Sequence, residues 1–89
     1  MDVAARFGDN LRRHRKRADL SQEDTAVMAS LHRTAVGMIE RGLRLPRADT
    51  VVKLAAVLEI EPGELFEGIA WESESIRYGQ FKPDPPDTL

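Results

Sequence analysis

Apolar residues recur along the first two thirds of the chain at helical spacing, in short blocks separated by turn residues. Phe7, Leu11 and Ala18 fall on one face of a segment that runs from about Val3 to Ala18 and contains no proline. A spacing close to the helical repeat predicts an amphipathic helix. The pattern therefore predicts a first helix that covers most of the N-terminal segment.

The next two blocks predict a pair of short helices joined by a tight turn. Ser21 is a favourable N-cap for a helix from Gln22 to about Ala29, because its hydroxyl can accept a backbone N–H. After a break at residues 30–32, a second helix from about Arg33 to Arg41 is expected to stop at Gly42, a residue type that favours helix ends. This pattern is typical of a helix-turn-helix.

Two further helices are expected before the composition changes. The strongly apolar segment from Asp49 to Leu58 predicts the central core helix, and Pro62–Phe66 predicts a last short one. Five helices joined by short turns predict an all-α domain at residues 1–68. We also expect the core to use all of the apolar face of the Val51–Leu58 segment.

Residues 69–89 form a tail with a different character. It carries four large apolar residues, which are Ile69, Trp71, Tyr78 and Phe81. Three interpretations stay open: a short β-hairpin that covers the domain, a dimer contact, or an extended strand that binds a partner protein. The end, Pro83–Asp87, cannot sustain a helix or a central strand.

Composition narrows the class of protein. The 89 residues suffice for one compact domain, and the absence of cysteine excludes disulfides and thiolate metal sites. No segment resembles a signal peptide or approaches the ~20 apolar residues that span a bilayer, so we expect a cytoplasmic protein without a membrane partner.

Charge is distributed unevenly, although the net charge is only −2. Residues 6–17 contain six cations against one carboxylate, and a second basic group comprises Arg33, Arg41, Arg44, Arg47 and Lys53. A phosphate backbone responds to a local patch rather than to the average over the chain. The two basic groups therefore keep nucleic acid among the expected partners.

Catalytic and metal-binding patterns are not evident. The two histidines, His14 and His32, lack a neighbouring nucleophile and an orienting group, and their separation matches no zinc motif. We therefore expect no enzymatic activity, no catalytic residues, no cofactor and no metal.

Several linked motifs resemble one family. The segment SQEDTAVMASLHRTAVGMIERG, flanked by LRRHR, ADTVVKLAAVL and PGELF, resembles the phage-repressor/Cro (Xre-type) helix-turn-helix family over about Phe7 to Phe66. This resemblance implies a five-helix, lambda-repressor-like domain. It also implies a repressor-type transcriptional regulator that binds a palindromic operator in double-stranded DNA as a homodimer.

The resemblance assigns roles to individual positions. DNA contacts fall on Gln22, His32, Arg33, Thr34, Gly37, Met38, Arg41, Arg44 and Arg47. Gln22 corresponds to a phosphate contact, Arg33 and Thr34 to base-reading positions, and the three later arginines to backbone contacts. Met38 fits either a thymine methyl contact or the core. Gly37 either brings the helix closer to DNA or is merely tolerated.

Arg15 and Glu40 correspond to a structural ion pair between the first and third helices. Several positions depart from the family pattern: His14 replaces an apolar core residue, Thr25 a leucine, Ser30 a glycine, and His32 an N-cap serine or threonine. A second function stays open, that of an antitoxin-like or accessory regulator whose tail binds a partner protein. Between dimer contact and folding back on the domain, we expect the tail to help hold a dimer.

Overall fold

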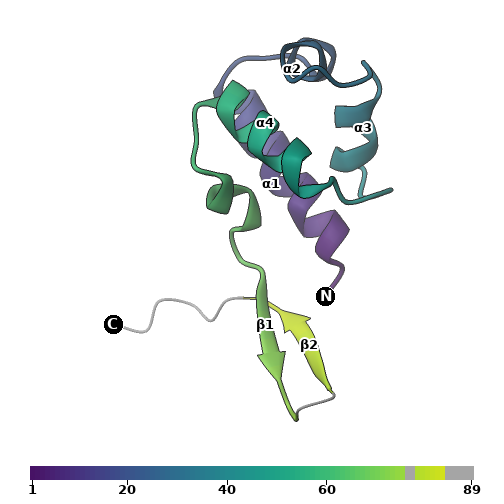
Figure 1. The fold of residues 1–89 in the computed structure, drawn as a ribbon, viewed down its shortest axis with the longest axis vertical. Coiled ribbons are helices and arrows are strands. Elements are labelled where there is room, and N and C mark those ends of the chain that lie inside the picture. The colour runs from purple at the N-terminus through teal and green to yellow at the C-terminus, as the bar shows by residue number, and fades with distance from the viewer. Residues whose placement is uncertain (76–77, 84–89) are drawn as a thin grey trace.

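A computed structural model describes residues 1–75 and 78–83, so part of the Pro83–Asp87 segment lies outside the described residues. Helices at the N-terminal end are followed by a short hairpin (Figure 1). In chain order the elements are α1 (Val3–Arg17), α2 (Gln22–Met28), α3 (Ala35–Glu40), α4 (Ala48–Leu58), the 3-10 helix η1 (Pro62–Phe66), β1 (Ala70–Ser73) and β2 (Gly79–Lys82).

The prediction of five α-helices in an all-α domain is wrong for the last of the five helices. The described residues contain four α-helices, and the fifth expected helix is the 3-10 helix η1. The Glu64 N–H donates to the Glu61 carbonyl three residues earlier, at 2.9 Å. With only five residues, η1 is too short to gain much from α-helical propagation, and 3-10 bonds are common in such short connectors.

Helix α3 begins two residues later than expected, at Ala35 rather than Arg33. The Thr34 N–H donates to His32 Nδ1 at 3.2 Å, and the Ala35 N–H donates to the His32 carbonyl at 2.8 Å. These two hydrogen bonds fold His32, Arg33 and Thr34 into a turn before α3. Arg33 and Thr34 therefore lie in the turn that leads into the helix.

The turn between α2 and α3 uses a backbone conformation that is uncommon for serine. Ser30 has φ 57°, in the left-handed region that favours glycine. This explains why related sequences often carry glycine at the position. The Thr25 departure is also accommodated, because its buried hydroxyl donates to the Ser21 carbonyl at 2.8 Å.

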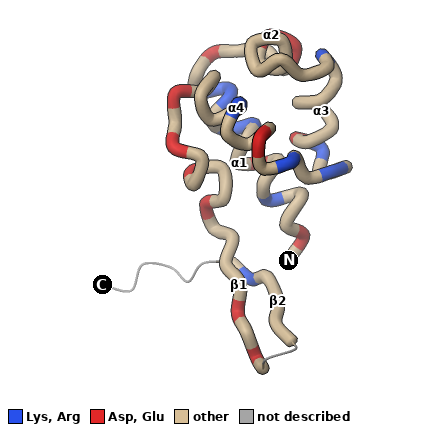
Figure 2. The backbone as a smooth tube through the Cα atoms, viewed as in Figure 1, with Lys and Arg blue, Asp and Glu red and all other residues tan. Residues whose placement is uncertain are grey.

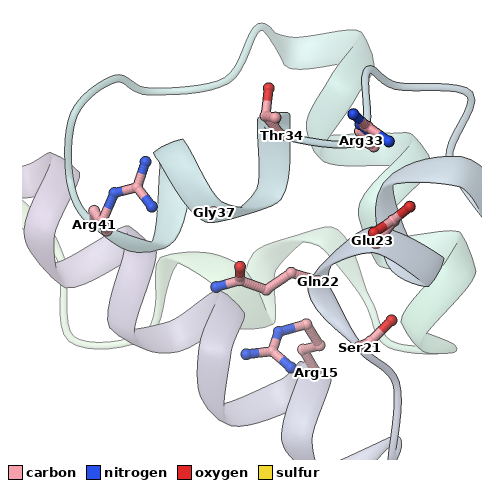
Figure 3. Close-up of a pocket in the computed structure, with 8 residues that line it drawn as sticks. All are labelled: Arg15, Ser21, Gln22, Glu23, Arg33, Thr34, Gly37 and Arg41. Atoms are coloured by element: carbon pink, nitrogen blue, oxygen red, sulfur yellow. The ribbon is translucent and has the colours of Figure 1, made fainter.

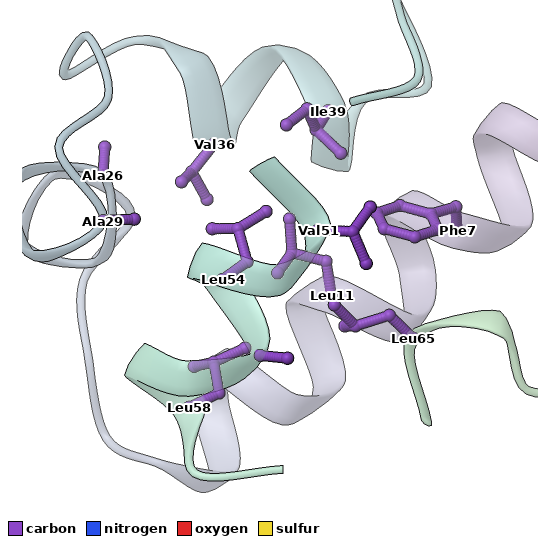
Figure 4. Packing of buried hydrophobic residues seen from close by; sticks show 11 residues of the cluster. Phe7, Leu11, Ala26, Ala29, Val36, Ile39, Val51, Leu54, Leu58 and Leu65 are labelled. Atoms are coloured by element: carbon purple, nitrogen blue, oxygen red, sulfur yellow. The ribbon is translucent and has the colours of Figure 1, made fainter. Parts of the chain in front are cut away.

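The hydrophobic core lies among α1, α2, α3, α4 and η1 (Figure 4). Its largest fully buried apolar side chains are those of Phe7, Leu11, Val36, Ile39, Leu54 and Leu65. Helices α1 and α3 approach each other closely at Gly8, where an added Cβ would lie 2.5 Å from the Ile39 carbonyl oxygen. Only glycine fits between these backbones, so Gly8 sets the distance between α1 and the helix that follows the turn.

The tail forms a β-hairpin, which was one of the three interpretations left open by the sequence. Strands β1 and β2 are antiparallel, and Trp71 lies opposite Phe81 with ring centroids 5.0 Å apart in an edge-to-face arrangement. The hairpin extends away from the helices (Figure 1). Both rings keep about half of their surface exposed, at 56% for Trp71 and 45% for Phe81.

The expectation that the core uses all of the apolar face of the Val51–Leu58 segment is wrong. Val51, Leu54, Ala55 and Leu58 are buried, but Val52 is 58% exposed. Its side chain lies beside the buried face rather than on it, because consecutive residues are about 100° apart around an α-helix. None of the helices in the described residues has both the length and the apolar character needed to cross a membrane.

Arg15 of α1 and Glu40 of α3 form the ion pair that the resemblance suggested. Arg15 Nε donates to Glu40 Oε2 at 2.5 Å and Nη2 donates to Oε1 at 2.9 Å, while Nη1 donates to the Leu20 carbonyl at 2.8 Å. The side chains of Arg15 and Glu40 are 10% and 3% exposed. The bidentate geometry fixes α3 against α1 and the start of the helix-turn-helix.

Hydrogen bonding to Glu40 raises the pKa of the Arg15 guanidinium above its ordinary value, while burial acts in the opposite direction. A base whose pKa is raised by folding stabilises the protein at every pH below its unfolded value. For arginine that range covers all physiological pH. We therefore expect the contribution of Arg15 to be insensitive to pH near neutrality.

Replacing Glu40 by alanine should destabilise the fold by about 3–5 kcal/mol, because a buried guanidinium loses its partner. Thermal or denaturant unfolding measures the change. Glu23→Ala, at an exposed carboxylate on α2, is the matched control and should stay within about 0.5 kcal/mol of wild type. A double variant, Arg15→Met with Glu40→Leu, should recover most of the loss. Equal stability of Glu40→Ala and wild type would show that the pair does not hold α3.

Candidate nucleic-acid interface

Helices α2 and α3 and the turn between them border a shallow hollow of about 510 Å³ (Figure 3). Its lining combines the start of α2, the turn before α3 and one face of α3, over Arg15, Ser21, Gln22, Glu23, Arg33, Thr34, Gly37 and Arg41. Five of the nine positions predicted to contact DNA meet here: Gln22, Arg33, Thr34, Gly37 and Arg41.

Gln22 is held in this hollow by the same carboxylate that pairs with Arg15. Its Nε2 donates to Glu40 Oε1 at 3.0 Å. Helix α2 starts at Gln22 because the Ser21 hydroxyl accepts the Asp24 N–H at 2.9 Å, which confirms Ser21 as the N-cap. The cap fixes the backbone and Glu40 fixes the side chain, so Gln22 presents its amide in a defined orientation.

Gly37 provides the space that Gln22 occupies. A Cβ at Gly37 would lie 3.0 Å from Gln22 Oε1, and 3.5 Å from an Arg41 guanidinium nitrogen. The position is buried within α3, so the missing side chain accommodates a contact between α2 and α3. The structure therefore gives this glycine an intramolecular packing role.

Three arginines and one glutamate line the hollow, namely Arg15, Arg33, Arg41 and Glu23. Arg15 is compensated by Glu40, but Arg33 and Arg41 form no ion pair with any residue among 1–75 and 78–83. Many basic residues lie on α1, around α3 and on the loop after it, whereas acidic residues are frequent from the end of α4 through η1 into the hairpin and also occur on α2 (Figure 2). The charge is unevenly distributed, and the hollow has an excess of cations.

The remaining predicted positions lie outside the hollow. Arg44 and Arg47 border a second hollow of about 150 Å³ beyond α3, and the Arg47 side chain is 88% exposed and 3.6 Å from Asp49. Met38 is half-buried. His32 is exposed, and its Nδ1 lies 2.9 Å from Thr34 Oγ1, so its observed contacts stabilise the turn.

Sequence reasoning missed the part that Glu40 plays in holding Gln22, and it did not place Ser21 or Glu23 on the hollow. Gln22 and Glu40 are 18 residues apart, and the hydrogen bond between their side chains depends on the angle between α2 and α3. The sequence did contain a signal for Ser21 and Glu23. Both flank Gln22, which was predicted to contact DNA from the exposed N-terminal end of its helix.

The chain is similar to several known proteins. Residues 11–65 match the helix-turn-helix family. The chain is 40% identical to the control protein C.MunI of Mycoplasma sp over 80% of its own length and 97% of that protein. It is 36% identical to the control protein C.BamHI of Bacillus amyloliquefaciens, over 68% of its length and 76% of that protein.

Solved structures show the same fold. The restriction-modification controller protein C.AhdI from Aeromonas hydrophila superposes with a TM-score of 0.69 at 44% identity, covering 71% of this chain and 96% of that one. A hypothetical transcription factor, NHTF, from Neisseria gives a TM-score of 0.69 at 30% identity, covering 72% and 74%. These relatives are regulators rather than enzymes.

The relatives named above support the helix-turn-helix family without selecting its phage-repressor and Cro branch. The matched segment includes α2, the turn and α3, together with the hollow that they border. The chain belongs to the helix-turn-helix family and is a DNA-binding transcriptional regulator.

Proposed function

We propose that the chain reads a specific sequence in double-stranded DNA through the hollow bordered by α2 and α3. The observation that carries this proposal is the meeting of Gln22, Arg33, Thr34 and Arg41 in one exposed concavity, where the two arginines form no ion pair with residues 1–75 or 78–83. A helix-turn-helix directs the N-terminal end of its second helix into the major groove. The turn before α3 places Arg33 at that end.

Different residues of the hollow have different tasks in this proposal. Arg33 reads base edges, because a guanidinium can donate two bonds to guanine O6 and N7. Gln22 binds a phosphate: its amide nitrogen carries two hydrogens, and Glu40 accepts only one of them. Arg41, Arg44 and Arg47 follow the DNA backbone. Thr34 and Met38 lie close enough in sequence to Arg33 to complete the base-reading surface.

His32 and Gly37 support this surface indirectly. His32 stabilises the turn that presents Arg33, through its contacts with Thr34. Gly37 accommodates the Gln22 side chain. Their effect on DNA binding is therefore one of positioning, although both were first expected to contact DNA.

We further propose that the chain is a controller of restriction-modification genes that acts in the cytoplasm on a palindromic operator. C.AhdI supports this assignment, because it is a restriction-modification controller protein that matches 71% of this chain at 44% identity. Repression, the outcome expected from a phage-repressor resemblance, requires only that the bound protein occlude a promoter.

The proposed division into a DNA-binding unit at residues 1–68 and a tail at 69–89 falls at Gly68, which has φ 75°. The base of the hairpin packs on the helices: Phe81 and Ile69 line an apolar hollow of about 230 Å³ with Val3, Phe7, Leu45, Pro46, Val51 and Phe66. Trp71, which lies opposite Phe81 on the neighbouring strand, does not line this hollow and is 56% exposed. Exposed apolar area of this kind favours a partner surface.

We propose that a second copy of the chain covers this surface, which would give the two-fold arrangement that a palindrome requires. A single domain reads few base pairs, and two recognition helices about 34 Å apart read two half-sites. Leu43, Leu45 and Phe66 are each more than 40% exposed and extend the apolar area beyond the tail. A partner protein on the tail, as in an antitoxin-like regulator, is the competing occupant.

Arg33→Ala should relax specificity, whereas Arg44→Ala should weaken binding to all sequences alike. Loss of a base contact costs roughly 1–3 kcal/mol at one base pair, while loss of a phosphate contact lowers the slope of log K against log salt by about one. Selection of bound duplexes from a random pool, followed by salt titration of a selected and a scrambled site, measures both. An unchanged selected motif in Arg33→Ala, or equal wild-type affinity for both sites, would contradict the proposal.

Replacing Trp71 and Phe81 by serine should shift the protein from dimer to monomer, because the hairpin loses its apolar contacts. Analytical ultracentrifugation should give wild type about twice the chain mass of 10.0 kDa. Val27→Ser, at an exposed apolar residue on α2, is the matched control and should stay dimeric. A monomeric wild type would refute the dimer. Copurification of a different protein with wild type, lost in the double variant, would favour the partner-binding alternative.

A further inference from the structure

His14 is a buried polar residue that the DNA-binding function does not use. It lies on α1 with only 3% of its surface exposed, and neither ring nitrogen has a hydrogen-bond partner among residues 1–75 and 78–83. Buried nitrogen atoms without a partner are uncommon in native proteins. His14 does not line the hollow bordered by α2 and α3.

Two carboxylates from the segment at η1 face this histidine. His14 Nε2 lies 3.6 Å from Glu67 Oε1, which is too long for a hydrogen bond. One ligand atom each from His14, Glu64 and Glu67 lie within 4.8 Å of one another. An imidazole and two carboxylates that converge in this way form a donor set for a cation.

One separation in this donor set is close to that of a tetrahedral zinc site. Zinc binds imidazole nitrogen and carboxylate oxygen at about 2.1 Å, which places neighbouring ligand atoms about 3.4 Å apart. The His14–Glu67 separation of 3.6 Å is close to that value. We propose that His14, Glu64 and Glu67 bind Zn²⁺, or a divalent transition-metal ion of similar preference, with water as the fourth ligand.

Groups around the ligands already orient the two carboxylates. Glu67 Oε2 accepts from Arg13 Nη2 at 2.6 Å, and Glu64 Oε2 accepts the Glu61 N–H at 2.7 Å. Glu67 therefore has one oxygen held by Arg13 and the other near His14, and one oxygen of Glu64 is held by the Glu61 backbone. Such outer-shell bonds are typical of metal-binding carboxylates and fix their direction.

A bound ion would join α1 to the segment that leads into the hairpin. Asn10 Nδ2 of α1 already donates to the Leu65 and Glu67 carbonyls at 3.0 and 2.9 Å, so the backbone around the site is anchored. No zinc motif is visible along the chain because His14 and Glu64 are 50 positions apart. The proposed site differs from the expectation that the chain binds no metal, and it does not depend on the proposed DNA contacts.

Thermal unfolding of the full chain with added Zn²⁺ or Mg²⁺ tests the site. Zn²⁺ at a hundredfold excess over its Kd should raise Tm by about 10–20 °C, because only the folded chain brings the three ligands together. Mg²⁺ should leave Tm unchanged, since it prefers oxygen ligands in octahedral geometry. An unchanged Tm in millimolar Zn²⁺, or an equal shift with Mg²⁺, would overturn the proposal.

Variants assign the response to the three residues. His14→Leu, and separately Glu64→Gln with Glu67→Gln, should each abolish the Zn²⁺-dependent shift in Tm. The glutamines keep the hydrogen-bond acceptors, so that variant remains informative if His14→Leu does not fold. His32→Asn removes the other histidine and should respond like wild type. A response retained by either site variant, or lost in His32→Asn, would place the ion elsewhere.

Discussion

One carboxylate, that of Glu40, holds the helix-turn-helix together and also positions one of its candidate DNA contacts. It accepts two hydrogen bonds from Arg15 of α1 and one from Gln22 of α2. Because Glu40 itself belongs to α3, three helices meet at this carboxylate. This shared acceptor therefore links the three helices beside the hollow.

Two glycines allow the helices to come close enough for these bonds. Gly8 lets α1 approach the carbonyls at the end of α3, and Gly37 leaves space for Gln22. Both residues lower intrinsic helix propensity, which costs about 1 kcal/mol each relative to alanine. Tertiary packing outweighs that preference. The two glycines therefore lie where a backbone or a side chain from another helix must come close.

Much of the fold could be predicted from periodicity and turn residues. The starts of α1, α2 and α4 follow from apolar spacing and, for α2, from the Ser21 cap. The start of α3 could not, because His32 holds Thr34 in a turn through a side-chain contact that periodicity does not report. The 3-10 form of η1 was missed for a related reason, since apolar spacing hardly separates the two helix types over five residues.

The residues of the candidate site could be predicted better than their geometry. The family resemblance assigned DNA contacts to Gln22, Arg33 and Arg41, and the structure shows them around one hollow. The resemblance did not separate them from Arg44, which lies by another hollow, and it did not show that His14 faces two carboxylates from the η1 segment. Contacts between residues distant in sequence require the packing of whole elements, which no local pattern contains.

The most direct measurement of the central claim is an amide chemical-shift map of ¹⁵N-labelled protein titrated with a duplex selected for binding. The account predicts that the largest changes fall on residues 21–23 and 33–41, around the hollow held by Glu40. The same titration with a scrambled duplex should give smaller changes at Arg33 and Thr34. Largest changes on the hairpin, at residues 70–73 and 79–82, would contradict the account.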